Sequence, residues 1–382
     1  MTSSIDQFFK NFFHQTPQLF TAPGRINLIG EHVDYNEGVV MPAAVNYSFT
    51  FAMAAGQSDK CNVFAHDLPE GLSFSIYDLN PGETWVNYLM GVLDGFMRRG
   101  VTLRGVDVVF GGNVPSGAGM SSSAALCCGF ATGLNHLFAA GFGKLELARI
   151  AQYAEREFAG VNCGLMDQYA SLFGEADSFL LLDCRTLQHE PIRFPSGDVE
   201  ILLIDSKVKH TLASTAYNQR RQNCEEGVHV LRQKFADVRS LRDVTPAMLA
   251  AVRGQLSDET FLRCSYVVGE MQRVQKAATA LRTGDLTATG AWMYETHEGL
   301  SRQYEVSCAE LDFLVALAAA EKTWVPGARL MGGGFGGCTI NLVKRPHRHA
   351  FIEKVRHNYF AQFKKEPDFY SVKLEAGARP IA

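Results

Sequence analysis

The chain has 382 residues, of which 47% are hydrophobic and 20% charged, and its formal net charge is −4. That length predicts two domains rather than a single core, and the composition is typical of a globular protein. The slightly acidic balance argues against nucleic acid or an anionic membrane surface as the main partner.

The cysteines and the first residues indicate the compartment. The nine cysteines are an odd number, contain no C-x-x-C motif and include the adjacent pair Cys127 and Cys128 in an apolar run. This pattern is typical of buried thiols in a reducing cytoplasm rather than of a disulfide framework. We expect no secretory leader, because no basic segment precedes an apolar one at the N-terminus, and no apolar run is long enough to span a membrane. The expectation is a cytoplasmic monomer without membrane, nucleic-acid or obligate protein partners.

The first half of the chain mixes strands and helices. Short apolar or alternating runs predict strands, and longer runs with a helical period predict helices. The expected strands are 48–54, 61–66, 72–77 and 106–110. The expected helices are 5–13, a segment that begins at 85, 124–138, 144–160 and a short helix after Gly164.

A change in composition near 195–198 predicts a boundary between domains 1–198 and 199–382. The second half begins with a strand at 199–204, has a glycine-rich loop at 332–337 between strands, and ends with a strand at 369–374. Its expected helices are 212–236, 258–282, 286–303, 307–320 and 347–363. This order is typical of an α+β unit with helices on one side of an antiparallel sheet.

A second glycine-rich loop joins the strand 106–110 to the helix that follows. Its glycines, Gly117 and Gly119, let an anion approach the backbone amides, and the helix N-terminus behind them is partially positive. The loop lacks the lysine of a P-loop and the third glycine of a dinucleotide fingerprint. From these residues alone, a phosphate site and an ordinary turn before a serine-capped helix both remain open. A phosphate site here needs its cation from an arginine or a serine-bound metal.

Residues 31–36 form a dense polar segment between two apolar strand-like pieces. Glu31, His32, Asp34 and Asn36 offer hydrogen-bond donors and acceptors close together, which suits a polyhydroxylated ligand. A polar surface hairpin is one alternative. A metal site is another, although a single histidine without a second one at i+4 argues against it.

Further candidates stand nearby in the sequence. Trp85 and Tyr88 share a helix face and could flank a flat base, although such pairs more commonly pack in a core. Glu155 flanks an apolar helix face, where a carboxylate needs a partner such as magnesium unless its side chain reaches solvent. Asp167 falls in a first helical turn, where it serves either the helix dipole or a catalytic role toward a hydroxyl. Five glycines in the six positions 332–337 predict a close approach of the backbone to the other domain or to the ligand.

Three motifs in the same order resemble those of the galactokinases, within the GHMP small-molecule kinase superfamily. They are Pro23–Asn36, Gly117–Ala124 and Gly332–Cys338. The resemblance implies an N-terminal domain like ribosomal protein S5, a ferredoxin-like C-terminal domain, and an active site in the cleft between them. It also implies phosphorylation of galactose by ATP at the anomeric hydroxyl, which gives galactose 1-phosphate and ADP and begins galactose use by the Leloir pathway.

The resemblance also assigns roles to residues. The base is Asp167, and Arg25 stabilises the transferring phosphoryl group. The sugar is held by Glu31, His32, Val33, Asp34, Gly164 and Tyr217. The nucleotide is held by Trp85 and Tyr88 near adenine and by the loop Gly117, Ala118, Gly119, Met120, Ser121, Ser122 and Ser123. Magnesium is bound by Ser123 and Glu155.

The chain departs from the family pattern at a few positions. Met120 replaces Leu, Cys127 replaces a frequent Glu, Val33 replaces Thr, and Glu37 replaces Asp or Gln. These changes put fine sugar selectivity in doubt rather than the reaction class. One rival is a related kinase for N-acetylgalactosamine, arabinose or a uronic acid, and the intact run 34–36 disfavours the first of these sugars. A sugar sensor without catalysis is the other rival, disfavoured by the complete serine–alanine run 121–125.

Overall fold

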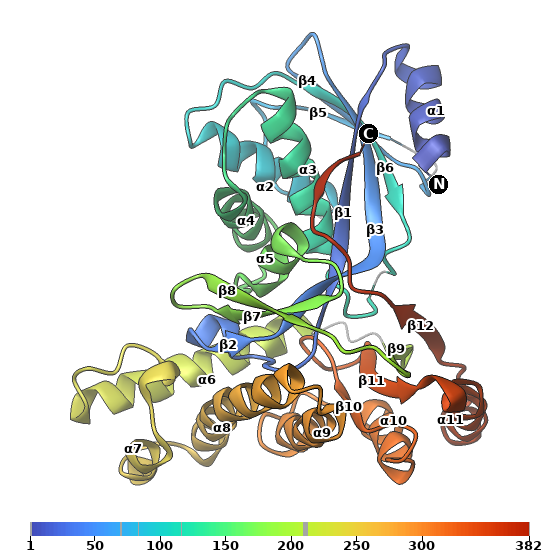
Figure 1. Ribbon diagram of the computed structural model, residues 1–382. Helices are drawn as coiled ribbons and strands as arrows, with labels where there is room; N and C mark the ends of the chain where they lie inside the picture. Colours follow the sequence, from blue (N-terminus) through green and yellow to red (C-terminus); the bar gives the residue numbers. More distant parts are fainter. Residues whose placement is uncertain (1, 69–70, 83, 116, 209–212, 382) are drawn as a thin grey trace.

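The structure is a computed structural model that describes residues 2–68, 71–82, 84–115, 117–208 and 213–381. Figure 1 shows two layered halves joined at a long strand, β1, with the two chain termini near each other in the N-terminal half. None of the helices within these ranges is both long and apolar enough to cross a bilayer.

The N-terminal half is built on a six-stranded sheet in the order β13-β1-β3-β6-β4-β5. Its strands are β1 (Gln18–Asn27), β3 (Pro42–Ala55), β4 (Lys60–Ala65), β5 (Leu72–Ser75), β6 (Val106–Gly112) and β13 (Arg379–Ile381). Neighbours are antiparallel except β4 and β6, which run parallel. One face carries α2 (Val86–Met97), α3 (Ser122–Leu137), α4 (Lys144–Tyr153) and α5 (Met166–Phe173), and α1 (Thr2–Phe13) packs on the other (Figure 1).

Apolar side chains point alternately to the two faces of β3, which explains why helices cover both faces of this sheet. Phe51 and Met53 belong to the core beneath the α2–α5 helices, whereas Ala52 and Ala54 pack with Ile5 of α1. Successive side chains of a strand point to opposite faces, so a continuous apolar run buries both. The predicted strands and helices of this half are present, although β3 begins before the predicted 48–54 and the α-helix predicted at 144–160 ends at Tyr153.

The C-terminal half contains an antiparallel sheet in the order β10-β11-β9-β12. These strands are β9 (Val199–Asp205), β10 (Gly327–Leu330), β11 (Cys338–Lys344) and β12 (Asp368–Val372). The helices are α6 (Ala213–Lys234), α7 (Pro246–Ala250), α8 (Asp258–Arg282), α9 (Leu286–Arg302), α10 (Ala309–Ala320) and α11 (Arg348–Phe363). Residues 209–212 lie outside the described ranges, so the predicted first residue of the helix at 212–236 cannot be compared.

The prediction of helices on one side of this sheet is only partly right. Leu202 and Ile204 face α10 and α11, as expected. The opposite face, with Ile201 and Leu203, packs against the end of β1 and also against α8 through residues such as Val274. An apolar strand such as β9 buries both faces, so the second face needs a cover that local patterning does not identify.

Two features of the topology were not predicted. A three-stranded sheet, β2-β7-β8, lies between the halves and consists of β2 (Val39–Val40), β7 (Ser178–Asp183) and β8 (Gln188–Arg193). In addition, the C-terminal strand β13 returns to the first sheet and pairs with β1. The end of the chain therefore completes the N-terminal half.

Helix α3 lies close to the sheet because small residues face it. A Cβ atom on Gly129 would lie 2.1 Å from the ring of Phe51. Gly129→Ala should therefore lower the free energy of unfolding by about 1–3 kcal/mol, as measured by urea unfolding, because it overpacks the core.

The matched control is Gly254→Ala, in the short helix η4 (Arg253–Gln255), where an added Cβ meets no atom within 4 Å. That variant should be neutral or more stable by about 0.4–1 kcal/mol. Equal stability of the two variants would contradict close packing of α3 on β3.

Candidate active site

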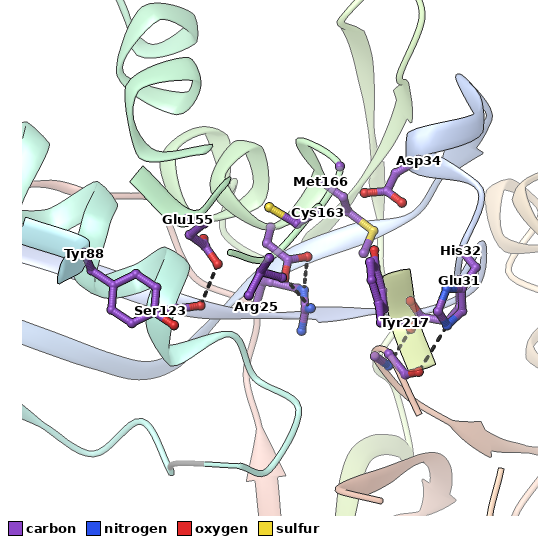
Figure 2. Close-up of a pocket in the computed structure, with 15 residues that line it drawn as sticks. Arg25, Glu31, His32, Asp34, Tyr88, Ser123, Glu155, Cys163, Met166 and Tyr217 are labelled. Carbon is purple, nitrogen blue, oxygen red and sulfur yellow. Dashed lines mark hydrogen bonds and ion pairs between the residues drawn. The ribbon is translucent and has the colours of Figure 1, made fainter. Parts of the chain in front are cut away.

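A cavity of about 180 Å³ lies where the two halves meet. Fifteen residues line it (Figure 2). They are Arg25, Glu31, His32, Asp34, Tyr88, Ser123, Glu155, Val161, Cys163, Gly164, Met166, Asp167, Tyr217, Gly332 and Gly333. Figure 2 shows Tyr88, Ser123 and Glu155 at one end, Glu31 and His32 at the other, and Arg25 between them.

Arg25 reaches the centre of the cavity because β1 is irregular beside it. The pairing register of β1 with β3 shifts between Pro23 and Arg25, and a Cβ on Gly24 would lie 2.6 Å from the carbonyl oxygen of Met120. A bulge of this kind re-aims the side chain that follows it. The close approach also lets the amide of Arg25 donate to that same carbonyl at 3.0 Å.

Arg25 and Asp167 form a two-pronged ion pair. Nε of Arg25 lies 2.7 Å from one carboxylate oxygen of Asp167, and Nη2 lies 2.6 Å from the other. Burial alone would lower the pKa of Arg25, but the carboxylates around it, Asp167 first and then Glu31 and Asp34, together outweigh it and the pKa is raised. The side chain of Asp167, in the first turn of α5, keeps 24% of its surface exposed, against 6% for Arg25. Arg25 is thus a fixed cation, and Asp167 faces the cavity.

The glycine-rich loop is attached to this pair. Nη1 of Arg25 donates to the carbonyl of Gly119, and the hydroxyl of Ser121 donates to Asp167. Ser121 has a left-handed backbone (φ 53°) and does not cap α3 with its side chain, so the predicted serine cap is wrong at this position. Its hydroxyl instead ties the loop to Asp167, while the first amides of α3 keep no partner within the helix.

Glu155 lies at the end of the cavity nearest α3. The predicted helix 144–160 is confirmed up to Tyr153, after which the turn η2 (Ala154–Phe158) is a π-helix. Glu155 is 5% exposed and accepts hydrogen bonds from Ser123 at 2.9 Å and Gln168 at 2.6 Å. Burial, and then repulsion from Asp167, raises its pKa to about 7. The sequence placed Glu155 on a helix flank, but the π turn buries it.

His32 is held in one tautomer by its partners. The carbonyl of Gly333 can only accept, so Nε2 of His32, at 3.1 Å, carries the hydrogen. Burial lowers the pKa of His32 to about 4, so the ring is neutral and Nδ1 accepts from Tyr35 at 2.8 Å. Tyr35 in turn accepts from Tyr304 at 2.8 Å. Both ring nitrogens of His32 are thereby used by the protein, which fixes the orientation of the ring.

Glu31 is fixed from the C-terminal half. One of its oxygens, Oε1, accepts from Arg329 of β10 at 3.0 Å and from the amide of Gly332 at 2.8 Å. Neither Glu31 nor Arg329 is exposed by more than 3%. Buried carboxylates need such partners, and here the pairing leaves the carboxylate in the wall of the cavity.

Asp34 and Tyr217 complete this end. The carboxylate of Asp34 packs directly on Gly164, since a Cβ there would lie 1.8 Å from it. Burial and then the nearby Asp167 raise the pKa of Asp34 to about 6. The ring of Tyr217, from α6, lies 5.1 Å from that of His32. Glycine at 164 is thus required for the position of the carboxylate.

The structure brings most of the predicted residues together, but not all. Val33 is fully buried in a core cluster with Val40 and Leu180, and Trp85 packs edge-to-face on Phe110 at 5.3 Å. Within the loop, only Ser123 lines the cavity, while the side chains of Ala118 and Met120 are buried in the core. Gly117, Gly119, Ser121 and Ser122 stay beside the cavity rather than in its wall.

Some lining and supporting residues were not predicted. Val161, Cys163 and Met166 line the cavity beside Asp167, and Arg329 supports it from behind. The first three flank predicted residues in sequence, which was the available signal. Arg329 stands three positions before a glycine-rich motif, but no local pattern marks its buried partners.

The chemistry of the cavity is set by four carboxylates around one guanidinium. Hydroxyl groups of a ligand can donate to Glu31 and Asp34 at one end, while Arg25 and the helix N-terminus suit a phosphate at the other. Among the described residues, no cluster of three or more histidine, cysteine, aspartate or glutamate side chains could hold a metal ion. A site of Glu31, His32 and Asp34 for a metal is therefore not formed.

Comparison with known proteins identifies the family. Residues 7–55 match the galactokinase galactose-binding signature, 87–175 match the N-terminal domain of GHMP kinases, and 277–361 match their C-terminal domain. The chain is 38% identical to the galactokinase of Clostridium acetobutylicum, over 99% of this chain and 98% of that protein. The chain belongs to the galactokinase family.

The chain is also similar to other members of the galactokinase family. The galactokinase of Thermotoga neapolitana is 40% identical over 94% of this chain and 99% of its own length. The crystal structure of Lactococcus lactis galactokinase complexed with galactose has a TM-score of 0.95 at 30% identity and covers 99% of both chains. The family matches and this likeness confirm the two-domain α+β fold predicted from the sequence.

Asp34→Asn should stabilise this galactokinase-family fold at neutral pH. The folded-state pKa of Asp34, about 6, lies above its ordinary value of 3.8. Between these values the folded chain holds a proton that the unfolded chain has lost, so stability falls as the pH rises through this window. The variant, which cannot ionise, should melt at a higher temperature than wild type at about pH 7.5 and at nearly the same temperature at about pH 4.

Asp243→Asn is the matched control. Hydrogen bonds from Arg185 lower the pKa of Asp243, so that carboxylate stabilises the fold once ionised and its removal should lower the melting temperature at neutral pH. A melting temperature of Asp34→Asn below that of wild type at about pH 7.5 would refute the raised pKa of Asp34.

Proposed function

We propose that this chain transfers the γ-phosphoryl group of ATP to the anomeric hydroxyl of galactose, giving galactose 1-phosphate and ADP. The observation that carries the proposal is the position of Asp167. Its carboxylate is bonded to Arg25 and Ser121 on the loop side and lines the same cavity as Glu31, His32 and Asp34. The family match and the galactose in the Lactococcus lactis structure support galactose as the acceptor.

The sugar end supplies acceptors with fixed directions. Glu31 and Asp34 accept hydrogen bonds from sugar hydroxyls, and the ring of Tyr217 forms a wall beside them. The absence of a side chain at Gly164 leaves room for the carboxylate of Asp34. The neutral ring of His32 forms part of the cavity wall without adding a charge. The backbone of Val33, whose side chain is buried, connects the two binding carboxylates.

Phosphoryl transfer needs alignment and charge neutralisation rather than a strong base. The anomeric oxygen attacks the γ-phosphorus, the bond to the bridging oxygen of ADP breaks, and the hydroxyl proton passes to Asp167. Asp167 takes the proton late, when the attacking oxygen has lost electron density. Arg25 neutralises charge on the transferring group from a position that its ion pair with Asp167 fixes.

We further propose Ser123 and Glu155 as the protein ligands of magnesium bound with ATP. A hydroxyl and a carboxylate oxygen within 2.9 Å of each other suit this ion, which takes oxygen ligands and commonly one or two carboxylates together with substrate phosphates. When bound, the ion would neutralise phosphate charge. The nucleotide phosphates then lie along the loop 117–123.

The remaining assignments stay predictions. Tyr88 lines the cavity and supports an adenine site on α2, and Trp85 stands one turn before it. Nine free thiols support a cytoplasmic location. A monomer and a domain boundary at 198/199, with β13 returning to the first sheet, are our further proposals.

A coupled ADP assay with a panel of sugars tests the function. Galactose should give ADP release that depends on both substrates, whereas N-acetylgalactosamine, arabinose and galacturonic acid should give little. Turnover of one of these sugars without turnover of galactose would contradict the proposed substrate.

Asp167→Asn should keep sugar and ATP binding but lose most turnover, by about 10²–10⁴-fold in kcat, because the amide cannot accept the hydroxyl proton. Calorimetry of galactose binding and the ADP assay measure the two effects separately. A rate close to wild type would exclude Asp167 from the reaction.

Glu155→Gln should raise the magnesium concentration needed for half-maximal rate by about tenfold or more, because a neutral amide is a weaker ligand than a carboxylate. The control is Glu157→Gln, on the same π turn, whose carboxylate does not line the cavity. If both variants share the magnesium dependence of wild type, Glu155 is not a ligand.

A further inference from the structure

The segment that carries the sugar-binding residues has a strained backbone. Gly30 and His32 both have left-handed conformations, with φ of 98° and 61°, and Glu31 stands between them. A non-glycine residue in this region is strained and persists only where its surroundings fix it. The side chain of Glu31 lines the cavity from within this strained segment (Figure 2).

A buried arginine of the C-terminal half holds the start of the segment. Arg329, in β10, has no exposed surface. Its guanidinium donates to the carbonyl of Asn27 at 2.5 Å, to the carbonyl of Leu28 at 2.7 Å and to the carboxylate of Glu31 at 3.0 Å. One side chain therefore fixes both the end of β1 and the acid that follows it.

Helix α8 holds the middle of the segment. The hydroxyl of Tyr266 donates to the carbonyl of Glu31 at 3.1 Å, and the amide of Gly30 donates to Glu270 at 2.9 Å. Glu270 is fully buried, and its charge is balanced by Arg273 at 2.7 Å. The amide that precedes Glu31 is thus bound by a buried carboxylate whose other oxygen is paired with an arginine.

None of these three side chains lines the cavity, so each acts through the backbone or through Glu31. We propose that Arg329, Tyr266 and Glu270 are positioning residues that fix the sugar-binding segment 27–32 from the C-terminal half, and that they set the affinity for the sugar rather than for the nucleotide. The proposal rests on the function proposed above, with galactose as the sugar.

The test compares Tyr266→Phe, Glu270→Gln and Arg329→Lys with wild type. Tyr266→Phe and Arg329→Lys remove hydrogen bonds to the segment while nearly keeping side-chain volume, and lysine cannot reproduce the fork of arginine. Glu270→Gln keeps an acceptor for the amide of Gly30 but removes the charge that strengthens this bond and the pairing with Arg273. We expect KM for galactose to rise by about three- to tenfold for Tyr266→Phe and by about tenfold or more for the other two, because Glu31 loses its fixed direction. KM for ATP should stay within about twofold and kcat within about threefold of wild type. Calorimetry of galactose binding without ATP should show the same loss as KM.

The matched control is Arg263→Lys. Arg263 is an equally buried arginine of α8, 2% exposed, but it donates to the carbonyl of Gln303 at 2.6 Å and pairs with Glu305. Its replacement should lower the melting temperature without changing KM for galactose, which is what a purely structural role predicts.

The outcomes separate the two proposals. If wild type phosphorylates galactose and the three variants share the galactose affinity of Arg263→Lys, the positioning role is overturned while the function stands. If wild type phosphorylates another sugar instead, the proposed substrate fails, and the same variants are assayed with that sugar, where an unchanged KM overturns the positioning role. Should Arg329→Lys or Glu270→Gln not fold, Tyr266→Phe decides, because it removes only a hydroxyl group.

Discussion

The ion pair between Arg25 and Asp167 is the contact on which the geometry of the cavity depends. It joins the irregular end of β1 to the first turn of α5, two segments 142 positions apart in the chain. The glycine-rich loop then attaches to both partners, through Gly119 on Arg25 and Ser121 on Asp167. Three separate segments are thereby fixed around one pair of charges, and the side chains that these segments place in the cavity wall depend on it.

The charge of Asp167 also lowers the stability of the folded state, because other carboxylates lie close to it. Asp167 is one of four carboxylates in the cavity wall, and after burial its charge is the largest cause of the raised pKa of both Asp34 and Glu155. Raised carboxylate pKa values mean that the folded state is destabilised by ionisation at neutral pH. A ligand that donates hydroxyl groups, or a cation bound near Glu155, relieves that repulsion. The free energy that such binding would release and the cost of gathering these carboxylates therefore have one origin.

Much of the fold and of the site could be predicted from the sequence where the determining contacts are local. Apolar periodicity predicts β3, α3 and α8, and the predicted site residues Asp167, Arg25 and Glu31 do meet in one cavity. The π turn that buries Glu155 could not be predicted, because the helical pattern continues through it. The burial of the Val33 side chain also could not, because the residues it packs against include Leu180, far away in the chain.

Hydrogen bonds between residues far apart in the chain also could not be predicted from the sequence. Nothing near Arg329 or Glu270 in the sequence indicates that their partners are backbone groups some 240 to 300 positions away. Each looks like an ordinary charged residue of a strand or a helix, whose default expectation is the surface. Their burial makes sense only once β1 and the C-terminal half are packed together.

The end of β10 shows why both halves are needed for one reaction. Arg329 and the amide of Gly332 hold Glu31, and the carbonyl of Gly333 holds His32, so this short stretch fixes the sugar end. The same glycine-rich stretch passes close to the other loop: a Cβ on Gly332 would lie 3.6 Å from the carbonyl of Gly119, and one on Gly337 would lie 3.4 Å from that of Gly117. Both glycines have left-handed backbones, with φ of 83° and 77°, so the two loops stay in contact through a conformation that other residues would strain. In the proposed reaction this backbone segment therefore acts together with the Arg25–Asp167 pair, since it touches both the residues proposed for the hydroxyl and the loop proposed for the phosphate, and phosphoryl transfer requires that alignment.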